Sequence, residues 1–315
     1  MIVRLLIAAA LLLLAGPAPA ADPQGTWALR AGDTTIMQFK VSKTPSGWTG
    51  EWQRPSHFKS DGINFSGISG PVVRRTARST REVVGGVEMT FDDPAPGAFP
   101  DVFVIRAHSG STAQVSYIAF GNEPATLVRA MPGKAIGGWD KKRVYVRTVD
   151  RPTNAEMTAI FDADQSVRKH WESANWKAVE VADRGRRMRT QAILDAGMLH
   201  SGDDYYHAAF VFQHGSEPGD YLKAHALALI ATARGKPSAT WIAAATLDRY
   251  LQSIGQPQVY GTQFSNKDGT MRQAQPFRSD LLSDAIRTAS GVPALAEQDA
   301  EYERLTKAVP VAKKP

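Results

Sequence analysis

The chain of 315 residues contains no cysteine. It therefore forms no disulfide and offers no thiolate ligand to a metal. It also lacks the N-terminal cysteine through which a bacterial lipoprotein carries its lipid. The stability of the folded chain must come from core burial alone.

Long apolar runs are scarce after the first 20 residues. The run from Leu5 to Ala15 is shorter than the roughly 20 residues of a membrane-spanning helix. It follows Arg4 and precedes a Gly-Pro helix breaker and small residues, which is the layout of a signal peptide over residues 1–20, cleaved after about Ala20. We expect an exported bacterial envelope protein, periplasmic or secreted, without a stable transmembrane segment after cleavage. An uncleaved N-terminal anchor is the alternative.

A large excess of one charge is also absent. The net charge is +6, from 37 Lys and Arg against 31 Asp and Glu. Basic residues are scattered apart from a run at Arg184, Arg186, Arg187 and Arg189, which is either a solvated helix face or a contact for an anionic ligand. We expect no nucleic-acid partner.

Familiar catalytic motifs are missing. The sequence has no Gly-x-Ser-x-Gly, His-Glu-x-x-His, Walker phosphate loop or Rossmann glycine fingerprint. His200, His207 and His214 are spaced by seven residues, roughly 10 Å along a helix, which is too far for two of them to share a metal. We therefore expect neither a metal nor a cofactor.

Period-2 alternation dominates residues 22–148 and predicts an all-β domain. Met37, Phe39 and Val41 share one face of a strand, and Gly, Pro, Asp and Ser clusters separate the strands. The spacing favours an antiparallel barrel or sandwich. The predicted strands cover residues 36–41, 48–52, 87–91, 102–106, 113–118, 126–129 and 143–148.

Two Gly-x-Trp segments carry a loose resemblance. Gly25-Thr26-Trp27 and the segment from Gly47 to Trp52 look like parts of the small lipocalin-like barrels of bacterial envelope proteins. A barrel of this size can hold a ligand or be filled by its own side chains. We expect Trp27, Trp48 and Trp52 to fill the core.

The period becomes helical after a linker at residues 149–154. We predict an all-α domain over residues 155–307 and a disordered tail over residues 308–315. Asn154 and Ser238 are placed to cap helices. Predicted helices cover residues 155–171, 176–194, 204–214, 220–234, 239–254, 279–290 and 294–305, with a loop over residues 256–275.

Three polar residues in this apolar helical sequence are candidates for catalysis. His214 lies in the last turn of its helix, where a protonated imidazole can also cap the terminal carbonyls. His225 lies on a stripe with Leu222 and Leu229, and Asp248 lies on the next, antiparallel helix. An Asp248–His225 pair would be either an acid–base unit or a buried ion pair.

The segment Gln256 to Phe264 is rich in hydrogen-bonding groups. Its Tyr260, Thr262 and Gln263, with Gln213 and Arg249, are the candidate ligand-binding residues. Such a loop either binds a ligand or folds back to form hydrogen bonds with the unpaired backbone groups at helix ends.

The pattern Gln213-His214, Asp248-Arg249 and Tyr260-Gly-Thr-Gln263 resembles an uncharacterised bacterial family, a domain of unknown function, over residues 150 to 305. That family has no assigned activity to transfer, so the resemblance supports the domain boundary and the candidate site.

Three functions stay open. The first is a binding protein whose helical domain holds a small polar ligand or peptide near His214, His225, Asp248 and Tyr260–Gln263. The second is a hydrolase that uses a His/Asp acid–base pair in the same cleft. The third is a structural envelope protein. The first two require these elements to converge. Whether the chain is an enzyme, and its oligomeric state, are not predicted.

Overall fold

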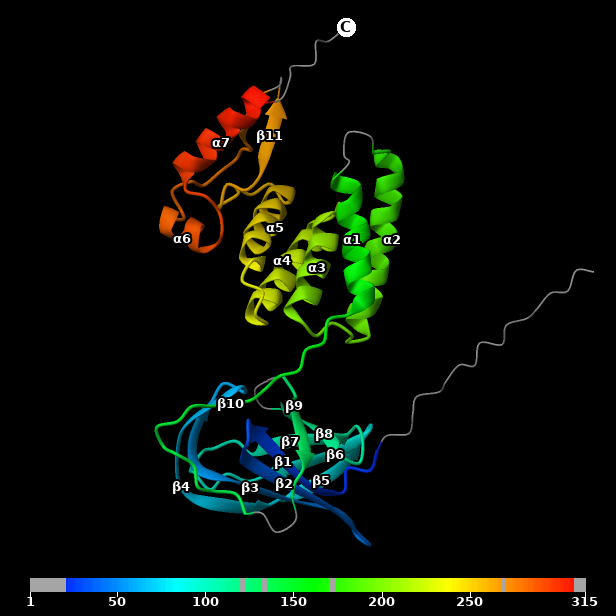
Figure 1. Ribbon diagram of the computed structural model, residues 1–315, viewed down its shortest axis with the longest axis vertical. Coiled ribbons are helices and arrows are strands. Elements are labelled where there is room, and N and C mark those ends of the chain that lie inside the picture. The colour runs from blue at the N-terminus through cyan, green and yellow to red at the C-terminus, as the bar shows by residue number, and fades with distance from the viewer. Residues whose placement is uncertain (1–20, 119–122, 132–134, 170–173, 268–269, 309–315) are drawn as a thin grey trace, which may run out of the picture. The chain divides into compact units, whose positions relative to one another are not determined.

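The computed structural model describes residues 21–118, 123–131, 135–169, 174–267 and 270–308. The chain divides into two compact units, Met1–Asp150 and Arg151–Pro315, called here the β unit and the helical unit (Figure 1). The boundary falls within residues 149–154. The expected signal peptide and all but the first residue of the expected tail lie outside the described residues. Within those residues, no helix combines the length and apolar character needed to cross a bilayer.

The β unit is one antiparallel sheet of ten strands, in the order β10-β4-β3-β2-β1-β9-β8-β7-β6-β5. This confirms the predicted antiparallel all-β architecture. β10 and β5 are the two edge strands of this order and are not paired with each other, so the described strands do not form a closed lipocalin-like barrel. The strands are β1 Gly25–Ala31, β2 Thr34–Thr44, β3 Gly47–Ser60, β4 Asn64–Thr76, β5 Ser79–Val83, β6 Gly86–Phe91, β7 Asp101–Ala107, β8 Thr112–Tyr117, β9 Ala125–Arg129 and β10 Tyr145–Val146.

The sheet is strongly curled (Figure 1). Just before β5, the Ala77 amide donates to the Gly50 carbonyl at 2.8 Å, and the Thr80 hydroxyl donates to the Trp48 carbonyl at 2.6 Å. These two hydrogen bonds connect the edge strand β5, and the residues just before it, to β3, although β5 and β3 are not neighbours in the strand order. One face of the sheet becomes a concave surface that holds the core of this unit.

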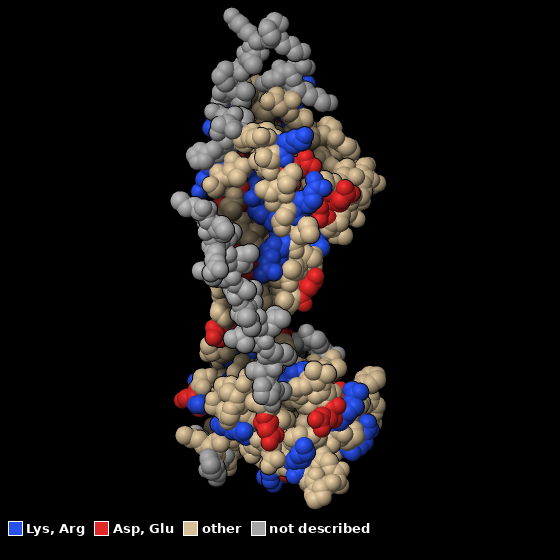
Figure 2. Space-filling model, turned by 90° about the vertical axis from the view of Figure 1, so that its right-hand side faces the viewer, with Lys and Arg blue, Asp and Glu red and all other residues tan. Residues whose placement is uncertain are grey.

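The alternation predicted from the sequence is visible in β6, where Val87, Met89 and Phe91 are fully buried between half-buried residues. Trp27 is also fully buried, and its Nε1 donates to the Pro23 carbonyl at 2.7 Å. The expected role of Trp27 as a core residue agrees with this burial. On the outer surface, acidic and basic side chains are interspersed over the face of the β unit seen in Figure 2.

The helical unit begins with five long helices, close to the predicted ones. In sequence, α1 packs on α2 and α3, α3 on α4, and α4 on α5 (Figure 1). The predicted antiparallel pair of α4 and α5 is confirmed. The helices are α1 Ala155–Lys169, α2 Trp176–Asp195, α3 Gly202–Gln213, α4 Pro218–Ala233, α5 Ala239–Ser253, α6 Asp284–Ala289 and α7 Leu295–Ala308.

Two local predictions have different outcomes. Asn154 caps α1, because its Oδ1 accepts from the Met157 amide at 3.0 Å. Ser238 stands at the N-cap of α5 but makes no side-chain capping bond, so that prediction was wrong. The stripe of α4 that carries His225 does not face the core, since its Leu222 and Leu229 are exposed. The smaller residues on the opposite side of α4, among them Ala224 and Ala228, are the buried ones and allow the neighbouring helices to approach closely.

A short hairpin, β11 Phe264–Lys267 and β12 Thr270–Gln273, interrupts the helical unit within the predicted loop. Its strands form a separate two-stranded sheet, and the Met271 amide donates to the Thr306 hydroxyl of α7 at 2.9 Å. This unit is therefore mainly helical rather than purely helical.

Candidate functional site

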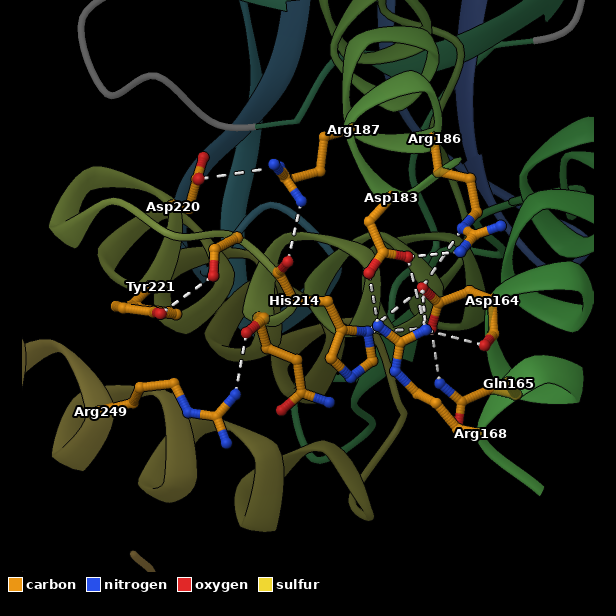
Figure 3. Close-up of polar contacts among 12 residues, drawn as sticks. Asp164, Gln165, Arg168, Asp183, Arg186, Arg187, His214, Asp220, Tyr221 and Arg249 are labelled. Carbon is orange, nitrogen blue, oxygen red and sulfur yellow. Dashed lines mark hydrogen bonds and ion pairs between the residues drawn. The ribbon is translucent and has the colours of Figure 1, made fainter. Parts of the chain in front are cut away.

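The C-terminal end of α3 is where the predicted polar residues begin to come together. The helix starts with a capping box between Ser201 and Asp204 and ends at Gln213. The carbonyls at its end have no partners within the helix. Side chains from three other elements supply donors, in a hydrogen-bonded arrangement that Figure 3 shows. Arg249 donates to Gln213 O at 2.9 Å, Arg187 to His214 O at 2.8 Å and Tyr221 to Gly215 O at 2.9 Å.

His214 is held by a carboxylate from α1. Its Nδ1 lies 3.0 Å from Oδ2 and 3.2 Å from Oδ1 of Asp164, which is completely buried. The imidazole is partly exposed, with 16% of the side-chain surface accessible. Its Nε2 has no hydrogen-bond partner among the residues that the structure describes. A carboxylate on one ring nitrogen fixes the orientation of the ring and leaves the other nitrogen free to act.

Two arginines connect Asp164 to a second carboxylate, Asp183 of α2 (Figure 3). Arg168 reaches Asp164 at 3.0 Å and Asp183 at 2.8 Å. Arg186 also pairs with both carboxylates, and its Nε lies 3.4 Å from Oδ1 of Asp164. Burial raises the pKa of Asp183, but hydrogen bonds from the two arginines outweigh this effect and hold its pKa below the ordinary value.

Arg249 joins two other predicted ligand-binding residues, Gln213 and Gln263. Besides its bond to Gln213, its Nε donates to Oε1 of Gln263 at 3.2 Å. Burial disfavours the charged guanidinium and lowers the pKa of Arg249, and no carboxylate among the described residues is paired with it to oppose this effect. A half-buried guanidinium bonded only to neutral oxygens is a candidate partner for an acidic ligand.

Asp248 has a different role from the one predicted. It is completely buried and accepts four hydrogen bonds from the following loop. The amides of Val259, Tyr260 and Thr262 donate at 2.7, 3.0 and 2.9 Å, and the Thr262 hydroxyl donates at 2.8 Å. The predicted pairing of Asp248 with a histidine was wrong: its oxygens hold the backbone of the loop in place.

His225 makes no hydrogen bond to this cluster among the described residues. Its Nδ1 is 2.9 Å from the carbonyl of Ala243 on α5, so the imidazole bridges two helices. The structure thus links Gln213, Arg249 and Gln263 at the end of α3 and places His214 beside them. Asp248 holds the loop after α5 in place through its hydrogen bonds with Thr262. In the same loop, the Tyr260 amide donates to Asp248 and the Tyr260 carbonyl accepts from Gln298.

The residues that hold His214 were missed by the sequence argument. In the arginine run, Arg186 and Arg187 have only 13% and 16% of their side chains exposed, whereas Arg184 and Arg189 are largely exposed. The interpretation as one solvated face therefore fails for half of the run. A signal was available: Asp183 and Arg186 lie on the same helical stripe of α2 as its buried apolar residues. The buried residues of α2 are Val179, Asp183, Thr190 and Ile193.

No set of three or more His, Asp or Glu side chains within the described ranges is arranged to hold a metal ion. The chain was compared with protein-family models, with curated proteins and with solved structures, and none of the three comparisons gave a match. The proposal below therefore depends on the geometry of the site itself.

Proposed function

We propose that this is an exported bacterial envelope protein whose helical unit binds a small polar ligand, or a polar peptide group, beside His214. The observation that carries the proposal is the Asp164–His214 pair, in which a buried carboxylate orients an imidazole whose Nε2 has no partner in the described part of the chain. Placing ionised groups in a protein interior is costly, and such clusters concentrate at functional sites.

The charges around His214 favour an acidic ligand. Four guanidinium groups face three carboxylates, which leaves one positive charge in excess. Arg249 is the group whose charge lacks an ionic partner among the described residues, and it reaches the same end of α3 as His214. The cluster consists of Arg168, Arg186, Arg187 and Arg249 with Asp164, Asp183 and Asp220.

A hydrolase is the second candidate, and the same pair supports it. A carboxylate that orients an imidazole is the arrangement of a general base. The orienting residue in this proposal is Asp164 instead of Asp248. Because no serine or threonine hydroxyl is bonded to Nε2 of His214 in the described ranges, the nucleophile would be a water molecule activated by the imidazole.

The binding proposal is tested by NMR of the imidazole groups in the full-length protein. Succinate, phosphate and N-acetylglycine serve as acidic probes, and N-acetylglycinamide is the uncharged control. We expect at least one acidic probe to shift the His214 signals and to leave those of His225 unchanged. The variant H214Q should lose binding, and H225Q should keep it after both are shown to be folded by circular dichroism. Binding that survives in H214Q, or no response to any acidic probe, contradicts the proposal.

The hydrolase alternative requires a turnover measurement. Purified protein is assayed on ester, peptide and phosphate-monoester substrates, and any activity is repeated with H214Q and H225Q. Loss of a general base lowers the rate about 10²- to 10⁴-fold. An activity that H214Q retains, or the absence of activity with the wild type on all three classes, removes this alternative.

A further inference from the structure

The concave face of the β unit contains a cavity of about 460 Å³. Seven strands contribute to its wall, with Leu29 of β1, Phe39 of β2, Trp52 of β3, Phe65 of β4, Phe103 of β7, Val115 of β8 and Ala125 of β9 as examples. Sites for small molecules have volumes of roughly 300–1,000 Å³ and mostly apolar walls with a few polar groups. The size and the lining of this cavity fit that description.

The cavity wall carries two hydrogen-bond donors that the chain leaves unsatisfied. Nε1 of Trp52 and Nε of Arg54 are buried, and neither has a partner among the described residues. Both residues line the cavity. Buried N–H groups in proteins are nearly always paired, so two unpaired donors on one cavity indicate that an acceptor from outside the chain belongs there.

The Trp48 indole shows how the same kind of group is normally satisfied. Its Nε1 donates to Oε2 of Glu82 at 3.3 Å, and the Nε1 of Trp27 donates to a backbone carbonyl. Neither Trp27 nor Trp48 lines the cavity. Of these three indoles, the one without a partner in the described chain is that of Trp52, at the cavity wall.

The guanidinium of Arg54 lies over aromatic rings. Its Cζ is 5.0 Å from the ring centre of Trp52 and 5.5 Å from that of Phe58. Its Nη1 donates to the carbonyls of Pro55 and Ser56. The group is thus held in place by stacking, by backbone contacts and by an ion pair between its Nη2 and Asp93 at 3.9 Å, with Nε left for a ligand.

The carboxylates at this end of the cavity already have partners. Arg75 lies 3.1 Å from Asp93 and 3.5 Å from Asp101, and the Tyr117 hydroxyl donates to Asp101 at 2.7 Å. Asp61 accepts from the amides of Ile63 and Asn64. The lining also includes Glu123, so the acids outnumber the bases there. A doubly charged anion is disfavoured by these acids, whereas a single acceptor group fits the two donors.

We propose that the cavity of the β unit binds an apolar molecule that carries one carbonyl or carboxylate group, whose oxygen accepts from Trp52 Nε1 and Arg54 Nε. The apolar body of the ligand lies against the aromatic and aliphatic wall. This site is separate from the one proposed beside His214, and neither depends on the other.

The test uses three probes with the same twelve-carbon chain and different head groups. Laurate carries a carboxylate, methyl laurate a neutral carbonyl, and dodecyltrimethylammonium a cation. Binding to the full-length protein is measured by calorimetry below the concentration at which each probe forms micelles, together with the ¹⁵N-indole NMR signals. Laurate or methyl laurate should bind and shift the Trp52 indole signal, and the preferred one identifies the head group. The cation should bind at least tenfold more weakly.

The variant W52F removes the N–H and keeps an aromatic ring. It should weaken binding about tenfold, the effect of one lost hydrogen bond to a charged acceptor. W48F is the matched control, because its indole is satisfied by Glu82 outside the cavity, and it should bind like the wild type. Equal binding by W52F, equal binding of the cation, or no binding of either carbonyl-containing probe would overturn the proposal.

Discussion

Asp164 and Asp248 are both completely buried carboxylates, and the chain stabilises them in different ways. Backbone amides and one hydroxyl surround Asp248, whereas arginines, a glutamine and an imidazole surround Asp164. Backbone donors have no alternative protonation state, so Asp248 is suited to holding a loop. The partners of Asp164 include the imidazole of His214, which is partly exposed, so this carboxylate holds a side chain that solvent can reach.

Replacement of Asp248 by alanine should destabilise the helical unit by at least about 3 kcal/mol, because four half-buried donors lose their acceptor. Thr262→Val is the matched control, since it removes one of the four bonds and should cost about 1 kcal/mol. Urea unfolding followed by circular dichroism measures both changes. A loss for D248A no larger than that for T262V would mean that the carboxylate does not hold the loop.

The carboxyl group of Asp61 should titrate far below an ordinary aspartate. Hydrogen bonds from the Asn64 amide, the Asn64 side chain and the Ile63 amide lower its pKa from 3.8 to about 2. Since the folded pKa is the lower one, its contribution to stability is present above pH 3.8 and is lost as the pH falls toward 2. Carboxyl ¹³C NMR measures the titration. The variant N64A should raise the pKa; an unchanged value in N64A would show that the side-chain bond has no effect.

At the scale of elements, helix periodicity predicted the five long helices of the helical unit, because each of them buries one regular stripe. The misses have local causes. β4 contains Gly67, Gly70 and Pro71, which normally signal turns, and its register with β3 shifts at two places. The β11–β12 hairpin has no apolar alternation and is stabilised by contacts with residues far along the chain.

The candidate site was predictable in part for a similar reason. Gln213, Arg249 and Gln263 were correctly grouped, since short connections bring α3, α4 and α5 together. The partner of His214 was not found, because Asp164 lies 50 residues earlier on α1, and helix periodicity does not specify which helices pack against each other. The Asp248–His225 prediction failed because Asp248 faces the loop that follows its own helix.

The contact between His207 of α3 and Phe161 of α1 should make the helical unit less stable at acidic pH. His207 stacks on Phe161 with ring centres 4.2 Å apart, and burial lowers its pKa below 6.5. A histidine with a depressed folded pKa contributes its full stability above the unfolded value, and this is lost as the pH falls through the lower folded value. Stability of the wild type should therefore decrease from about pH 6.5 downward.

The variant H207F keeps the stacked ring and removes the titrating group. Its stability should be equal to or about 1 kcal/mol above that of the wild type at neutral pH, because Nδ1 of His207 is buried without a partner in the described chain. The decrease on acidification should be smaller in H207F than in H200Q, a control at an exposed histidine of the same unit. Identical pH profiles of H207F and H200Q would exclude His207 as the source.

At the scale of the whole molecule, each unit has its own hydrophobic core. The core of the β unit is built from residues between Trp27 and Tyr145, and that of the helical unit from residues between Met157 and Ala243. Each of the two clusters consists of buried residues from one unit alone. The two proposed sites follow the same division: the cavity belongs to the first core, and the ionic cluster around His214 borders the second.

Because the cores are separate, we expect two unfolding transitions in calorimetry of the full-length protein. D248A should lower the transition of the helical unit by roughly 5 °C or more and leave the other unchanged. Met89→Ala, which removes a completely buried side chain of β6, should do the reverse. Expression of residues 21–150 and 151–308 as separate proteins should reproduce the two transitions. A single transition that both variants shift would show that the units fold as one cooperative body, and ligand binding in either site would then stabilise the entire chain.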